Sequence, residues 1–178
     1  MTIEKVLFLD NDGVICLQNN WGSRYNKRKR FVKQNPTAIK LPINLTFDNF
    51  DKKSVKVLNN IIEETDCEII ISSDWKLYAN LKDLSKYYLD QGICKAPIGC
   101  TPNMEVYDYH KNNYLMGNNF LAEKRDDEIK KFLDDNKVNK WVVVDDLNLT
   151  LDNFVHCPRQ LEGIKQAGIK EKIIKFLK

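Results

Sequence analysis

Three stretches of this chain are almost continuously apolar, and several longer ones repeat apolar residues at helical spacing. The continuous runs, rich in β-branched residues as in strands covered on both faces, occupy residues 6–9, 68–72 and 141–144. The helical spacing predicts helices over residues 51–66, 77–90, 126–136 and 170–177. Shorter strands are expected at 96–100 and 154–156. Because strands alternate with helical crossovers, the pattern predicts an α/β fold, a parallel sheet with helices on both faces.

Two stretches between these elements have no sustained period. Residues 16–50 contain Gly22, Pro36 and Pro42, which predict a long irregular excursion that could contain a hairpin. Residues 102–122 are polar and rich in Asn, which predicts a loop or small lid. We therefore expect one domain over residues 1–178, with 15–50 as a basic flap or small cap and 101–122 as a loop insertion.

Length and composition agree with one soluble domain. A chain of 178 residues can bury one sizeable core, and 43% hydrophobic with 30% charged residues is typical of a globular protein. No apolar run is long enough to span a bilayer, and Asp10 and Asp12 would interrupt the apolar core of a signal peptide. Five scattered cysteines without C-x-x-C spacing indicate neither a zinc site nor disulfides. We therefore expect a cytoplasmic protein without membrane association.

Net charge is only +3, but residues 24–33 concentrate basic side chains. The aromatic residues Trp21, Tyr25 and Phe31 are interleaved with them. Such a segment could bind a nucleic-acid end, with basic groups following phosphates and rings stacking on bases. It could equally be a solvated cationic lid that attracts any small phosphate. The candidate substrate-binding residues are Arg24, Lys27, Arg28 and Arg30, together with Trp75, which could either stack on a base or pack against the sheet.

Acidic residues follow the first and last of the apolar runs. The first run leads directly into Asp10-Asn11-Asp12-Gly13, and the run at 141–144 leads into Asp145-Asp146. Ser72 ends the run between them. Ligands of such sheets bind beyond the carboxyl ends of the strands, where these side chains would meet. One carboxylate could attack phosphorus while a second shuttles the proton to and from the ester oxygen.

In this order, the residues resemble the motifs of the haloacid dehalogenase-like (HAD) superfamily of phosphotransferases. The first motif matches Asp10-Asn11-Asp12-Gly13, the second Ser72, the third Lys124 or Arg125, and the fourth Asp145-Asp146. The resemblance implies a three-layer Rossmann-like α/β fold with only a small cap insertion. The stretch Ile70-Ile71-Ser72-Ser73-Asp74-Trp75 also looks like the small phosphatase domains linked to RNA repair, and Arg125 with the acidic residues after it resembles polynucleotide-end phosphatases.

The resemblance further implies a role for each motif residue. Asp10 would be the nucleophile that forms an aspartyl-phosphate, and Asp12 the general acid and then base. Mg²⁺ would be held by the carboxylates of Asp10 and Asp145 and the backbone carbonyl of Asp12, with Asp146 bound directly or through water. Ser72 would hydrogen-bond a phosphoryl oxygen, and Arg125, favoured over Lys124, would neutralise charge in the transition state.

Together these expectations favour a magnesium-dependent phosphomonoesterase. Because the insertions are too short for a full cap domain, the site would be open enough for a terminal phosphate of RNA or DNA. A nucleotidase or other small-metabolite phosphatase is the alternative enzyme. From a different class, the fold could serve as a non-catalytic adaptor that binds nucleic acid or protein.

Overall fold

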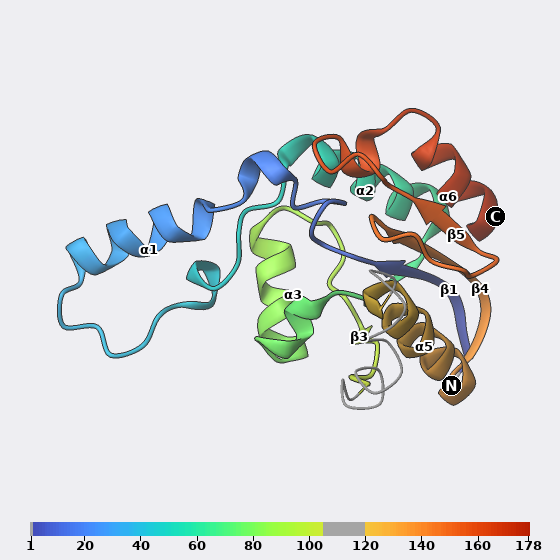
Figure 1. Cartoon of the computed structure of the whole chain (residues 1–178), viewed down its shortest axis with the longest axis horizontal. Coiled ribbons are helices and arrows are strands. Elements are labelled where there is room, and N and C mark those ends of the chain that lie inside the picture. Colours follow the sequence, from blue (N-terminus) through green and yellow to red (C-terminus); the bar gives the residue numbers. More distant parts are fainter. Residues whose placement is uncertain (1, 105–119) are drawn as a thin grey trace.

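The sheet brings the ends of three apolar runs together. In a computed structural model, which describes residues 2–104 and 120–178, five parallel strands lie in the order β3-β2-β1-β4-β5 (Figure 1). They are β1 (Thr2–Leu9), β2 (Glu68–Ile71), β3 (Gly99–Cys100), β4 (Lys137–Asp145) and β5 (Phe154–His156). In this register Leu9 pairs with Ile71 on one side and with Val144 on the other. The residues that follow these three therefore start from the same edge of the sheet.

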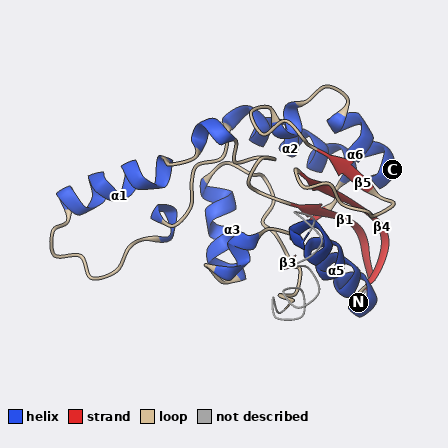
Figure 2. Cartoon of the chain, viewed as in Figure 1, coloured by secondary structure: helices blue, strands red, loops and turns tan. Residues whose placement is uncertain are grey.

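Helices cover both faces of the sheet, which confirms the predicted three-layer α/β fold (Figure 2). Alternate strand residues such as Leu7 and Leu9 pack with α2 (Lys52–Thr65), α3 (Leu81–Asp90) and α6 (Ile169–Leu177). The intervening Val6 and Phe8 pack with α5 (Phe120–Asp135) on the other face. This alternation follows from the two-residue period of a strand. It explains why the central runs are apolar at every position.

Helix boundaries agree with the sequence in part. Asp51 caps α2 by accepting a hydrogen bond from the Ser54 backbone N–H at 2.8 Å, as predicted. Helix α3 begins at Leu81 rather than at residue 77, because Asp74–Leu77 forms a short 3₁₀ turn, η3. Helix α5 already includes Phe120, so Lys124 and Arg125 lie within a helix rather than before one.

The stretch 16–50 is more ordered than the sequence pattern predicts. It holds the helix α1 (Ser23–Gln34) between the 3₁₀ turns η1 (Gln18–Asn20) and η2 (Ile43–Leu45), and no hairpin. Lys and Arg favour helices, but α1 buries no residue, so it lacks the apolar stripe by which helices are recognised. Figure 1 shows α1 projecting away from the sheet. Contacts from Lys27 Nζ to the Phe47 carbonyl (2.7 Å) and from Arg28 Nε to the Leu45 carbonyl (2.6 Å) attach it.

Three further expectations concern the cysteines, membrane-spanning helices and the second insertion. All five cysteines are free, as expected. Within the described part of the chain, no helix combines the length and apolar character needed to cross a membrane. Most of the loop expected at 101–122 lies outside the described residues, and its last three residues belong to α5.

The contacts that attach α1 come from residues 23–28, which predicts uneven stability along the chain. An isolated helix shorter than about 12–15 residues is marginal in water. We expect backbone amides of residues 29–34 to exchange hydrogen almost without protection, whereas those of Leu58 and Ile61 on the buried face of α2 exchange only through global unfolding. Hydrogen exchange followed by mass spectrometry at pH 7 measures both. Equal protection of the two helices would contradict this account of α1.

Candidate active site

The loop after β1 is held by its own backbone. The Asp10 N–H donates to the Val144 carbonyl at 3.1 Å, and the Ser72 N–H donates to the Leu9 carbonyl at 2.9 Å, which continues the sheet bonding one residue beyond the strands. The Asn11 carbonyl accepts N–H groups from the next turn, including that of Cys16 at 2.8 Å. Asp10 is therefore fixed at the strand end, and the chain turns back immediately after it.

Glycine is required at position 13 for two reasons. Its φ of +76° lies in the left-handed region, which side chains with a Cβ rarely adopt. A Cβ there would also lie 2.4 Å from Asp146 Oδ2. The loop after β1, which carries Asp10 and Asp12, thus packs directly against Asp146 in the loop after β4.

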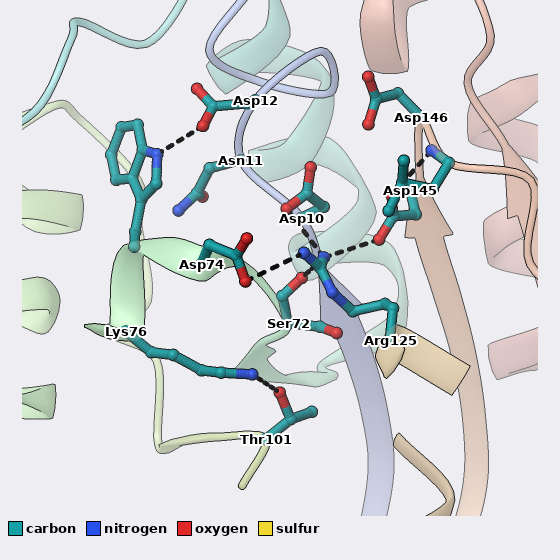
Figure 3. A network of polar contacts seen from close by, with 12 residues as sticks. Asp10, Asn11, Asp12, Ser72, Asp74, Lys76, Thr101, Arg125, Asp145 and Asp146 are labelled. Atoms are coloured by element: carbon teal, nitrogen blue, oxygen red, sulfur yellow. Dashed lines mark hydrogen bonds and ion pairs between the residues drawn. The ribbon is translucent and has the colours of Figure 1, made fainter. Parts of the chain in front are cut away.

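Arg125 lies between the buried acids (Figure 3). Its NH1 group donates to Asp10 Oδ1 at 3.0 Å, to Asp145 Oδ2 at 2.8 Å and to the Ser72 carbonyl. All four residues are at least nine-tenths buried. A guanidinium ion at this position compensates two carboxylates that the parallel strands force together.

Three carboxylates form a cluster that could hold a cation. Oxygens of Asp10, Asp145 and Asp146 lie within 4.8 Å of one another. An all-oxygen donor set of this kind suits Mg²⁺, so the residues present fit the metal that the sequence resemblance implies. The Asp12 carboxylate is not part of this cluster, and the expectation that its backbone carbonyl serves as a ligand stays a prediction. Gln160 donates to Asp146 Oδ2 at 2.5 Å and orients it.

Burial makes ionisation of this cluster costly. It raises the pKa of Asp10 to about 6, although Arg125 opposes the shift. The pKa of Asp145 is raised well above its usual range, first by burial and then by the neighbouring charge of Asp10. A divalent cation would oppose both shifts, because it favours the charged forms. A cation bound by the three carboxylates would therefore add to the compensation that Arg125 supplies.

Asp12 lies outside this cluster, on the exposed side of the loop. Its Oδ2 accepts a hydrogen bond from Trp75 Nε1 at 2.8 Å. Its pKa is raised, chiefly by desolvation from the surrounding protein, while the hydrogen bonds from Trp75 and Cys16 oppose the shift. Asp10 and Asp12 thus have different surroundings although only one residue separates them.

Trp75 is buried and packed against other aromatic rings, so it is not available to stack on a base. It is 6% exposed, and its ring stacks on Phe47 with centroids 4.4 Å apart and on Phe50 at 5.4 Å. Both contacts are nearly parallel, at 9° and 19°. The expectation that Trp75 stacks on a base is therefore corrected to the alternative of packing, because Phe47 and Phe50 occupy its faces. Its indole N–H holds Asp12.

Ser72, Arg125 and Lys124 differ in what they contact. Ser72 is fully buried, and its hydroxyl oxygen has no hydrogen-bond partner among the described residues. A buried polar atom without a partner at the same sheet edge is what a phosphoryl oxygen could satisfy. Arg125 reaches Asp10, whereas Lys124 Nζ lies 3.5 Å from both Asp74 Oδ1 and Glu128 Oε1. Of the two, Arg125 is thus the one in contact with Asp10; that it, rather than Lys124, neutralises charge on the phosphate stays a prediction.

Glu128 and Lys76 are site residues that the sequence interpretation missed. Glu128 is fully buried and lies 2.5 Å from Lys76 Nζ and 3.9 Å from Arg125 Nε. Lys76 also donates to Thr101 Oγ1 at 2.7 Å, and burial lowers its pKa. The spacing of four residues from Lys124 to Glu128 places them on one helix face, which was the available signal. Their burial was not visible, because charged helix residues usually face solvent.

The basic candidates of α1 are spread over different environments. Arg24 and Arg28 line a cleft beside Asp12. Lys27 is held by Phe47 and Asn49. Arg30 is exposed and lines neither cavity that borders Asp12. Only two of the four thus face the candidate site.

A parallel α/β sheet with these acidic, hydroxyl and basic groups at the carboxyl ends of its strands defines a haloacid dehalogenase-like domain. The chain belongs to the family described as the HAD domain in Swiss Army Knife RNA repair proteins, whose pattern it matches over residues 6–169. A search of curated proteins gave no match, and neither did a search of solved structures.

The close approach at Gly13 predicts a specific metal defect. Gly13→Ala should displace Asp146 and weaken Mg²⁺ affinity by about 10–100-fold, as loss of groups that orient ligands typically does. Gly168→Ala is the matched control, since its φ of +83° imposes the same strain while nothing lies within 4 Å of the added Cβ. Isothermal titration with Mg²⁺ measures both variants. If Gly13→Ala and Gly168→Ala bind Mg²⁺ with equal affinity, Asp146 is not a ligand of the metal.

The raised acid pKa values predict that the metal-free protein loses stability as pH rises. Because folding favours protonated Asp10, the folded state binds more protons between the ordinary pKa of 3.8 and about 6. Relative to Asp10→Asn, the wild type in EDTA should therefore lose about 1–3 kcal/mol of unfolding free energy from pH 4.5 to 7. Urea denaturation of both proteins tests this. A parallel pH dependence in the two would show that the cluster is not the cause.

Proposed function

We propose that this domain is a magnesium-dependent phosphomonoesterase that removes a terminal phosphate from RNA or DNA through an aspartyl-phosphate. The observation that carries the proposal is the convergence of Asp10, Asp145 and Arg125 at one sheet edge, with the unpartnered Ser72 hydroxyl beside them. Membership of a family named for RNA repair proteins supports a nucleic-acid substrate.

Asp10 is the nucleophile in this mechanism. Its carboxylate oxygen attacks phosphorus, and the bond from phosphorus to the ester oxygen breaks. Arg125 keeps Asp10 oriented and offers positive charge where negative charge develops on the phosphoryl oxygens, and the Ser72 hydroxyl donates to one of them. Bound Mg²⁺, held by Asp10, Asp145, Asp146 and the Asp12 carbonyl, would supply further charge neutralisation.

Asp12 acts as the general acid and then as the general base. It protonates the departing ester oxygen, for which its raised pKa is suited. It then takes a proton from the water that attacks phosphorus, the bond to Asp10 breaks, and inorganic phosphate leaves. The hydrogen bond from Trp75 Nε1 fixes the carboxylate of Asp12 for both steps.

Substitutions of Asp10 and Asp12 test whether one is the nucleophile and the other the general acid and base. Asp10→Asn should abolish phosphate release, and Asp12→Asn should lower kcat by about 10²–10⁴-fold, the usual worth of general acid–base catalysis. Asp134→Asn, an exposed acid on α5, is the control. Phosphate release is followed with Mg²⁺ from 3′-phosphorylated RNA and DNA oligonucleotides and from mononucleotides and sugar phosphates.

The substrate panel decides between enzyme classes. A preference for oligonucleotides supports end processing, whereas turnover confined to small phosphates would make the protein a nucleotidase or metabolite phosphatase. Undiminished turnover by Asp10→Asn would overturn the aspartyl-phosphate mechanism. Absence of turnover on every substrate, with Mg²⁺ bound, would favour the adaptor alternative.

A further inference from the structure

Two cavities meet at Asp12, beside the proposed nucleophile. One, of about 400 Å³, extends toward Trp21 and Asp48. The other, of about 560 Å³, extends toward Arg28 and Tyr78. Both volumes fall in the range of about 300–1,000 Å³ that small-ligand sites occupy. A substrate whose terminal phosphate lies near Asp12 could thus continue in either of two directions.

Charge distinguishes the two directions. The Trp21 branch contains Asp48, a buried carboxylate that accepts the Arg24 N–H at 2.7 Å and the Ser23 hydroxyl at 3.2 Å. The Arg24 guanidinium partly balances it at 3.7 Å. This branch therefore carries no surplus positive charge for a polyanion.

The Tyr78 branch is more favourable to phosphate. Arg28 donates through Nε to the Leu45 carbonyl at 2.6 Å, and no acidic side chain of the described residues pairs with it. Two acids line this branch: Asp12, which borders both cavities, and Asp74, which lies 3.5 Å from Lys124 and 3.9 Å from Arg125. A nucleic-acid backbone is therefore attracted along the side of Arg28.

An exposed aromatic ring lies in the same branch. Tyr78 is 71% exposed, although it follows directly on the η3 turn and its N–H donates to the Trp75 carbonyl at 3.0 Å. The backbone beneath the ring is thus anchored while the ring itself remains accessible. Exposed rings beside basic groups are the usual platforms on which single-stranded bases stack.

We propose that this branch, which we call the Arg28–Tyr78 groove, binds the nucleotide next to the terminal phosphate of a single-stranded polynucleotide. Arg28 contacts the backbone phosphate and Tyr78 stacks on the base. The proposal rests on the proposed function, because it assumes that the terminal phosphate lies at Asp10 and Asp12. It makes the groove the part of the site that separates oligonucleotides from small phosphate esters.

Specificity measurements test the groove. The readout is kcat/KM for a 3′-phosphorylated pentanucleotide divided by kcat/KM for p-nitrophenyl phosphate. Arg28→Ala and Tyr78→Ala should each lower this ratio by about tenfold, and Tyr78→Phe, which keeps the ring, should restore it. Lys29→Ala is the charge-matched control, an exposed residue of α1 that lines neither cavity, and should change the ratio by less than about twofold.

Binding without turnover separates this proposal from the phosphatase mechanism. In Asp10→Asn, a fluorescent pentanucleotide with a 3′-phosphate, made as RNA and as DNA, should bind with a Kd that Arg28→Ala or Tyr78→Ala raises about tenfold. If these Kd shifts occur but no substrate is hydrolysed by the wild type, the groove stands and the phosphatase proposal fails. If p-nitrophenyl phosphate is hydrolysed but the substitutions leave both readouts unchanged, the groove is rejected. The groove is also rejected if Lys29→Ala changes the specificity ratio as much as Arg28→Ala does. It is likewise rejected if the ratio falls only in Trp21→Ala, a substitution in the other cavity.

Discussion

The site depends on how this protein compensates carboxylates that its sheet forces together. Parallel strands in register end at one edge, so Asp10 and Asp145 lie beside each other with Leu9 and Val144 paired directly before them. Burying two negative charges at this separation is costly unless a cation accompanies them. Arg125 supplies one positive charge by hydrogen-bonding to both. The raised pKa values of both acids show that one guanidinium does not complete the compensation.

Arg125 in turn must be held in position, and this requirement explains the charged stretch at residues 123–128 of α5. Glu128, one turn along the helix, lies beneath Arg125 and Lys124 and also accepts a hydrogen bond from Lys76 of η3. Asp126 faces the loop after β4 and accepts from the Thr150 hydroxyl at 2.5 Å. The helix is thus fixed to the strand ends by ion pairs and hydrogen bonds, while Ile129 and Phe132 fix its other turns by apolar packing.

Periodicity was sufficient to predict the sheet and the acidic cluster, because apolar runs and strand ends are local features of a sequence. It was insufficient where tertiary contacts decide the structure. Helix α1 has no buried face, so the 3.6-residue period is absent and its helical propensity was outweighed by the nearby Gly and Pro residues. Glu128 and Lys76 are charged side chains that only an ion pair permits to be buried. The faces of Trp75 are covered by Phe47 and Phe50, which come from a segment with no predicted structure.

The contrast between Asp10 and Asp12 connects this architecture to the proposed catalysis. Two carboxylic acids of the same intrinsic strength can take different roles when their surroundings differ. Asp10 is buried against Arg125 in the carboxylate cluster, whereas Asp12 borders a cleft and accepts a hydrogen bond from the indole N–H of Trp75. Asp12 is exposed, so the described residues do not seal the cleft beside it. A polynucleotide lying along that cleft would itself displace water from Asp12, which would make the proposed proton transfers depend on the presence of a large substrate.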